Sequence, residues 1–154
     1  DESIVRMLAR VPWPYTAEHA RDFCAIERGP GDMQFAITLP GADGAPVIGT
    51  IAIFRDDDGH DCELGYWIGR QWQGRGIACE AVRGVLGTAR AIGMTQIVAG
   101  HFVDNHASGR VLRNCGFVET GQFTETASPG RGGAMVLARR YRCLLDPLQG
   151  CAAA

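Results

Sequence analysis

Apolar residues recur along the chain with two periods, and the change of period separates predicted helices from predicted strands. Helical spacing predicts helices over residues 1–10, 17–28, 77–91 and 107–115. Thr16 is a suitable N-cap for the second helix, and Pro12 stops the first. Gly93 and Gly116 follow the last two helices, where glycine commonly ends a helix.

Segments with apolar or alternating patterns predict six strands, at residues 34–39, 47–55, 62–68, 97–103, 117–126 and 134–143. Only turn-rich segments, at 40–46 and 56–59, separate the first three strands, so these strands should form an antiparallel meander. A segment rich in glycine at 128–133 joins the last two strands. Because helices and strands alternate after the meander, the sequence predicts a mixed α/β fold.

The composition supports a single domain over residues 1–154. Hydrophobic residues make up 46% of the chain and charged residues 21%, which is typical of a globular protein and excludes long disordered regions. The formal net charge of −2 argues against a nucleic-acid partner held mainly through phosphates. The longest apolar runs fall far short of the ~18 residues that a membrane span needs. We therefore expect neither a nucleic-acid partner nor a membrane partner.

The residue types limit the chemistry further. All 15 basic residues are arginine, so no lysine is present to form a Schiff base or to contact a phosphate group. The absence of lysine also indicates a GC-rich coding sequence. The six cysteines form no C-x-x-C pair and their spacing fits neither a zinc site nor a disulfide framework. We therefore expect free thiols in a reducing cytosol, and no metal.

The most informative motif lies between the third strand and the helix that follows it. Gln71, Gly74 and Gly76 fit the pattern Q-x-x-G-x-G, at the start of the predicted helix. Glycine lets the backbone turn sharply and approach a ligand closely. The first amides of a helix have no partner within it and lie at the positive end of its dipole, so this loop can hold a phosphate or pyrophosphate group.

Two other phosphate motifs fit the loop less well. A P-loop requires a lysine, which the chain lacks. A dinucleotide fingerprint requires glycine where Cys79 stands, and it follows the first strand of a βαβ unit rather than a meander. An acyl-CoA loop and an ordinary glycine turn before a helix both remain open on this motif alone.

A second motif follows one helix and one strand later. Asn105, Ser108, Gly116 and Phe117 fit the pattern N-x-x-S-x-x-x-x-x-x-x-G-F, and residues 63–68 read E-L-G-Y-W-I. Together with the glycine loop, these segments resemble the GNAT acetyltransferase superfamily, and its RimJ/RimL-like branch of ribosomal-protein N-acetyltransferases in particular. The resemblance covers residues 47–117 well and the flanks loosely.

The resemblance implies a particular fold. A central, mostly antiparallel sheet is flanked by helices and splays after the family's fourth strand, which is residues 62–68 in this chain. The family's first strand and most of its first helix have no counterpart here, so we expect that an N-terminal segment is missing from this sequence. A shortened member of the family is the alternative.

The resemblance also implies acetyl-CoA as co-substrate, without a metal, and direct attack of an amine on the thioester. The residues expected to contact acetyl-CoA are Trp67, Ile68, Gln73, Gly74, Arg75, Gly76, Ile77, Ala78, Asn105 and Ser108. Of these, the resemblance suggests Ser108 as the acid that protonates the leaving thiolate. The alternative is that Ser108 only caps the helix or holds CoA. Glu63 and Glu125 are the candidate bases. Arg131, in the last hairpin, is interpreted as a solvated loop residue.

The function implied is transfer of an acetyl group to a primary amine, either a protein N-terminus or a small molecule. The alternative is a non-catalytic acyl-CoA-binding or sensing domain of the same fold. A nucleotide-binding module is a third reading, and it predicts binding of ATP or NAD without CoA. By resemblance we also expect a bacterial, cytoplasmic protein that can form a homodimer.

Overall fold

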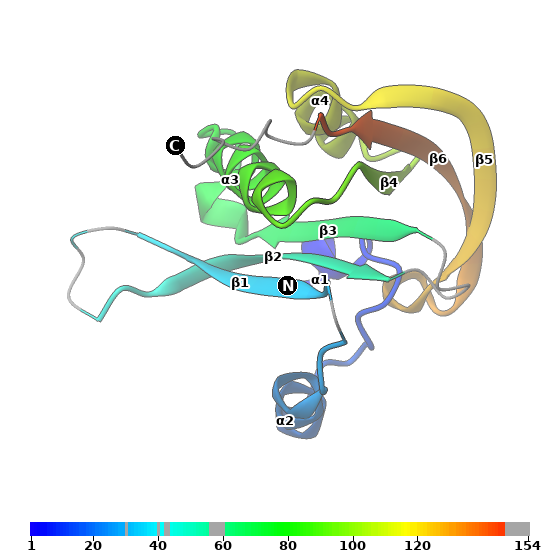
Figure 1. Ribbon diagram of the computed structural model, residues 1–154. Helices are drawn as coiled ribbons and strands as arrows, with labels where there is room; N and C mark the ends of the chain where they lie inside the picture. The colour runs from blue at the N-terminus through cyan, green and yellow to red at the C-terminus, as the bar shows by residue number, and fades with distance from the viewer. Residues whose placement is uncertain (30, 40, 42–43, 56–60, 147–154) are drawn as a thin grey trace.

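One six-stranded sheet organises the molecule (Figure 1). The computed structural model describes residues 1–29, 31–39, 41, 44–55 and 61–146. The strands are β1 (Met33–Thr38), β2 (Val47–Arg55), β3 (Cys62–Ile68), β4 (Gln96–Phe102), β5 (Val118–Ser128) and β6 (Ala134–Leu144). Their spatial order is β1-β2-β3-β4-β6-β5. With helices on both sides of this sheet, the predicted mixed α/β fold is confirmed.

The first three strands form the antiparallel meander that the sequence predicts. Strands β2 and β3 begin and end at the predicted residues. The turn expected at 56–59 lies outside the described residues, and the connector expected at 40–46 is described only in part.

Strands β3 and β4 run parallel and separate after a short contact. Only two residue pairs join them, Glu63 with Val98 and Leu64 with Ala99. β4 meanwhile pairs along its whole length with β6. The sheet is therefore open between β3 and β4 beyond Leu64, and this opening is the splay that the resemblance predicts.

Two helices cover one face of the sheet. They are α3 (Ile77–Ala91), which matches its predicted bounds, and α4 (His106–Asn114). α3 buries Val82, Val85, Leu86 and Ala89 in the main core, which also takes residues from β2, β3, β4 and β6. The short helices α1 (Glu2–Val5) and α2 (Ala17–Ala25) lie on the other side of the sheet (Figure 1).

The prediction of a helix over residues 1–10 is wrong for its second half, because α1 ends at Val5. The Arg6 carbonyl accepts a hydrogen bond from Nε of Arg131 at 2.8 Å instead of continuing the helix. Gly130 packs so closely on the Val5–Arg6 peptide that a Cβ there would lie 2.6 Å from the Val5 carbonyl carbon. A tertiary contact therefore overrides the helical spacing.

The second helix begins as predicted and ends early. Thr16 is its N-cap, in a capping box with His19. α2 ends three residues before the predicted Arg28, since Ile26 has extended backbone geometry with ψ of 120°. No residue of α2 is buried, so no packing holds further turns in place. The remaining boundaries differ from prediction by two residues or fewer.

Candidate active site

The loop between β3 and α3 has the geometry of an anion site. A 3-10 turn (Arg70–Trp72) follows β3, and Gly74 and Gly76 then adopt positive φ angles of 74° and 81°. Gly76 is the N-cap of α3 and has no side chain to cap the first amides. A Cβ at either glycine would meet no atom within 4 Å, so the space outside the loop is open to a ligand. Uncapped amides beside open space fit a phosphate group.

The side chains around the loop hold it against the end of β3. Nε2 of Gln73 donates a hydrogen bond to the Ile68 carbonyl at 2.9 Å. The Arg75 guanidinium stacks on the Trp72 ring with 5.0 Å to the ring centroid. Trp67 and Trp72 also line a surface hollow of about 690 Å³ that reaches α1. Of the residues expected near acetyl-CoA, those from Trp67 to Ala78 therefore lie on one continuous segment at the end of β3 and the start of α3.

The remaining two expected residues begin α4, on the far side of the sheet opening. Asn105 is the N-cap of α4, and its Oδ1 accepts a hydrogen bond from the Ser108 amide at 3.2 Å. Asn105 thus fills the capping role that was one of the alternatives for Ser108. The Ser108 side chain is left for another partner.

That partner is Tyr66 of β3. Its Oη lies 2.9 Å from Ser108 Oγ and 3.4 Å from the Ser108 carbonyl oxygen. The contact joins β3 to α4 across the opening between β3 and β4. Burial is the main cause that raises the pKa of Tyr66 to about 12, so its hydroxyl keeps its proton at neutral pH.

The two candidate bases lie on opposite faces of the sheet. Side chains alternate along a strand, so Glu63 shares a face with Gly65 and Trp67, opposite Tyr66. Both Glu63 carboxylate oxygens are paired, with Arg140 at 2.5 Å and with Arg10 at 3.3 Å.

Glu125 is placed differently. It is exposed on β5, directly across from Leu137 of β6. No hydrogen bond or ion pair within the described part of the chain involves its carboxylate. Leu137 shares its face of β6 with Arg139 and Tyr141, and Tyr141 is packed in the core beneath α4. Glu125 therefore lies on the same face of the sheet as Ser108.

Comparison with known proteins shows which family this chain belongs to. The family model of the acetyltransferase (GNAT) domain matches residues 1–118. The chain belongs to the GNAT acetyltransferase family. That match includes the glycine loop of α3 and the Asn105–Ser108 cap of α4.

Individual GNAT relatives are more distant. The [ribosomal protein uS5]-alanine N-acetyltransferase of Escherichia coli is 36% identical over 63 residues, which is 40% of this chain and 32% of that protein. The matched segment thus spans about a third of this curated relative.

Solved structures of other acetyltransferases share the fold. Ribosomal-protein-S5-alanine acetyltransferase from Vibrio fischeri superimposes with a TM-score of 0.66 at 21% identity, over 79% of this chain and 66% of that one. Spermidine N-acetyltransferase from Vibrio cholerae, solved in complex with CoA and spermine, gives 0.76 at 18% identity, over 96% and 85%.

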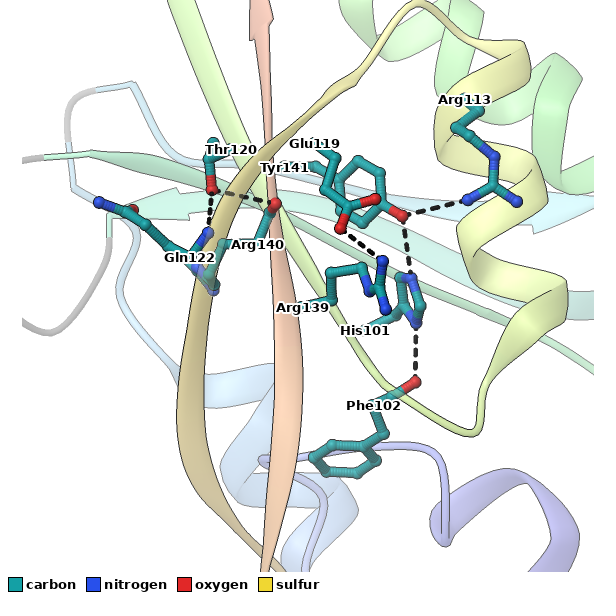
Figure 2. A network of polar contacts seen from close by, with 9 residues as sticks. All are labelled: His101, Phe102, Arg113, Glu119, Thr120, Gln122, Arg139, Arg140 and Tyr141. Atoms are coloured by element: carbon teal, nitrogen blue, oxygen red, sulfur yellow. Dashed lines mark hydrogen bonds and ion pairs between the residues drawn. The ribbon is translucent and has the colours of Figure 1, made fainter.

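A buried polar network supports α4 within this GNAT domain (Figure 2). Nδ1 of His101 donates to the Phe102 carbonyl at 2.7 Å, which leaves Nε2 to accept from the Tyr141 hydroxyl at 3.3 Å. Nη1 of Arg113, on α4, donates to the same hydroxyl at 3.2 Å. His101 therefore has a structural role, whereas His106 is exposed at the start of α4.

Arg131 is not the solvated residue that the sequence suggested. Its guanidinium donates two hydrogen bonds to Asp104, at 2.9 and 3.0 Å, and stacks on the Phe102 ring. Hydrogen bonding to Arg131 is the main cause that lowers the pKa of Asp104. Together with its bond to the Arg6 carbonyl, Arg131 ties the last hairpin to both α1 and the β4–α4 connection. No local pattern in the sequence indicates this contact, because Asp104 and Arg131 are 27 residues apart.

A membrane-spanning helix and a group of metal-binding side chains are both absent from the part of the chain that the structure describes. In it, no helix is long and apolar enough to cross a bilayer. The same residues contain no group of three or more His, Cys, Asp or Glu side chains arranged to hold a metal ion.

Proposed function

We propose that this GNAT domain is an acetyl-CoA-dependent N-acetyltransferase that transfers an acetyl group directly to a primary amine. The observation that carries the proposal is the opening between β3 and β4, which has the uncapped start of α3 at one end and Ser108 at its side. The acceptor is either a protein N-terminal amine or a small-molecule amine.

The chain's residues divide into a binding group and a reacting group. The amides of the first turn of α3 hold the pyrophosphate of acetyl-CoA. The edge of β3 near Trp67 and Ile68, which β4 does not pair, offers backbone groups to the extended pantetheine arm, beside the Gln73 side chain that donates to the Ile68 carbonyl. Asn105 fixes the start of α4 beside that arm. Acetyl-CoA supplies the activated acetyl group, and no metal is required.

Ser108 is proposed as the acid that gives a proton to the leaving sulfur. Its backbone is fixed by the Asn105 cap, so its side chain starts from a defined position at the beginning of α4. Glu125 is proposed over Glu63 as the carboxylate that accepts the amine proton, because Arg10 and Arg140 already pair with the oxygens of Glu63. An α-amine has a pKa of about 7.7–8.0, so part of such an acceptor is already neutral near pH 7, and the carboxylate accepts the proton of the part that is still protonated.

The first experiment is a set of thermal melts with acetyl-CoA, CoA, ATP and NAD. A ligand at 100 times its dissociation constant stabilises the protein by about 2.7 kcal/mol, which corresponds to roughly 5–10 °C for a domain of this size. We expect a shift with acetyl-CoA and CoA only. A shift with ATP or NAD alone would refute the loop assignment and favour a nucleotide-binding module.

Turnover separates the enzyme from a non-catalytic acyl-CoA sensor of the same fold. Release of free CoA thiol is followed with peptides that begin in alanine and with polyamines as acceptors. Release that depends on an amine supports the enzyme. Binding of acetyl-CoA without release for any amine in a broad panel would favour the sensor.

Location and assembly stay predictions of the sequence. We propose a cytoplasmic protein, which agrees with the free thiols of the five described cysteines. We also propose a homodimer, and sedimentation analysis of the purified protein tests it.

A further inference from the structure

The contact between Tyr66 and Ser108 joins a strand and a helix that lie on either side of the sheet opening. Tyr66 lies on β3 and Ser108 in the first turn of α4, 42 residues later in the chain, and the two side chains meet across the sheet opening. Neither residue needs this contact for its secondary structure. Asn105 caps α4, and the β3 backbone pairs with β2 along its whole length.

Either hydroxyl can be the donor in the contact between Tyr66 Oη and Ser108 Oγ, and the two directions differ in what they leave Ser108 free to do. A phenol has one proton, and it can go to either of the two Ser108 oxygens. Oγ is the nearer of them, at 2.9 Å against 3.4 Å for the carbonyl. If Tyr66 donates to Oγ, the Ser108 hydroxyl proton remains free to leave. If Ser108 donated instead, its proton would be held by the phenol and would not be available to a leaving group.

The surroundings keep the phenol in its proton-bearing form. Burial raises the pKa of Tyr66 to about 12. The hydrogen bond with Ser108 acts against this rise, and the nearby thiols of Cys115 and Cys79 add to it. Tyr66 is therefore a hydrogen-bond donor throughout the pH range in which an amine acceptor reacts. The first turn of α4 also favours negative charge on Oγ, because the helix dipole is positive there.

We infer that Tyr66 is a positioning residue that fixes the Ser108 hydroxyl in one rotamer and replaces the proton that Ser108 gives away. This inference rests on the proposed function. The acceptor nitrogen forms a bond to the acetyl carbon, the C–S bond breaks, and the sulfur leaves with the electron pair. Ser108 Oγ gives its proton to the sulfur, and Tyr66 Oη gives its proton to Oγ. Tyr66 then regains a proton from water, and the amine proton passes to Glu125 or to water.

The test uses Tyr66→Phe, Ser108→Ala and the double variant, with Tyr141→Phe as a control. Tyr141 is a second buried tyrosine with hydrogen bonds, to His101 and Arg113, and it lies outside the proposed site. Loss of one hydrogen bond that acts in the transition state should lower kcat of Tyr66→Phe about tenfold. The KM for acetyl-CoA and the Kd for CoA should stay unchanged. Tyr141→Phe leaves the contacts of the Ser108 hydroxyl in place, so its kcat should fall by less than that of Tyr66→Phe.

The double variant distinguishes positioning from a separate structural effect. If Tyr66 acts through Ser108, Tyr66→Phe should have no further effect in the Ser108→Ala background. Losses that multiply in the double variant would overturn the inference, and so would a wild-type kcat in Tyr66→Phe.

A readout without turnover separates this inference from the proposed function. In a high-resolution crystal structure of Tyr66→Phe, Ser108 Oγ should occupy more than one rotamer. A single unchanged rotamer would overturn the inference even if the wild type is a transferase. A wild type that transfers acetyl to no amine would refute the proposed function, and the rotamer result would then decide alone whether Tyr66 positions Ser108.

Discussion

Glu63 of β3 and Arg140 of β6 form an ion pair of 2.5 Å that passes over β4, the strand between them. Gly100 of β4 makes room for it, since a Cβ there would lie 2.9 Å from Nη1 of Arg140. The pair sits where β3 and β4 still touch, next to the Glu63–Val98 contact. The ion pair therefore holds β3 and β6 together across β4 at the point where the opening begins.

This position predicts that Glu63 matters for stability and Glu125 for rate. Glu63→Gln removes the charge that Arg140 and Arg10 face, and should lower the free energy of unfolding by about 1–3 kcal/mol. Glu125→Gln, on an exposed strand position, should leave stability unchanged. It should lower kcat/KM most below pH 8, where an α-amine acceptor is largely protonated, with little effect at pH 9.

Denaturant unfolding and pH–rate profiles of the two variants check this pair of predictions. Each variant is the control for the other, because both neutralise one glutamate. If Glu63→Gln lost its rate with unchanged stability, the assignment of the base would move to Glu63.

The sequence and the structure agree where local pattern decides the outcome. β2, β3 and α3 match their predicted bounds, because the apolar residues that define each element are close together in the sequence. The glycine loop and the Asn105 motif were found in the same way, since their residues are close in sequence. What the sequence missed depends on contacts between distant segments. The Arg131 contacts that end α1 and the meeting of Tyr66 with Ser108 both join residues far apart in the chain.

Valine in place of Gly76 should abolish CoA binding, and a matched variant can show that backbone strain is not the cause. Gly76 and Gly93 have φ angles of 81° and 85°, and each would place a Cβ in open space. Valine at either position should therefore cost a similar amount, about 1–2 kcal/mol, through left-handed backbone strain. Only Gly76→Val places its side chain where the pyrophosphate is proposed to bind.

Titration calorimetry with CoA measures the difference between the two variants. We expect Gly76→Val to lose binding and Gly93→Val to keep it, with similar falls in melting temperature. Equal CoA affinity in folded samples of both variants would refute the assignment of the loop.

The Asp104–Arg131 pair predicts a loss of stability in acid. Hydrogen bonding to Arg131 lowers the pKa of Asp104 in the folded protein below the unfolded value of about 3.9. The ionised carboxylate therefore stabilises the fold above that unfolded value, and the contribution disappears as pH falls through the folded pKa. Because the Asp104 side chain is half exposed, the contribution should be only about 0–1 kcal/mol.

Urea unfolding between pH 6 and pH 2.5 compares the wild type with Asp104→Asn. The stabilities should differ at pH 6 and converge at the acid end, since the variant has no proton to gain at this site. Two curves that stay parallel across the range would contradict the prediction. Glu119→Gln, which removes an ion pair with Arg139 away from α1, shows whether any effect is specific to the Arg131 contacts.

Two helical glycines should respond to alanine in opposite directions. Gly109 is buried on α4, and a Cβ there would lie 2.7 Å from Nε2 of His101. Gly84 is exposed on α3, and its Cβ would meet nothing within 4 Å. Gly109→Ala should destabilise the protein by about 1–3 kcal/mol through overpacking. Gly84→Ala should stabilise it by about 0.5–1 kcal/mol, because alanine loses less backbone entropy on entering a helix.

Thermal and denaturant unfolding of both variants measure these changes. Gly109→Ala should also disturb the hydrogen bond between His101 and Tyr141, because the new methyl group pushes the imidazole away from α4. The signals of the His101 ring in NMR spectra should then shift in Gly109→Ala and stay in place in Gly84→Ala. A Gly109→Ala protein as stable as the wild type would show that α4 can move away from β4, and it would contradict the close contact between Gly109 and His101.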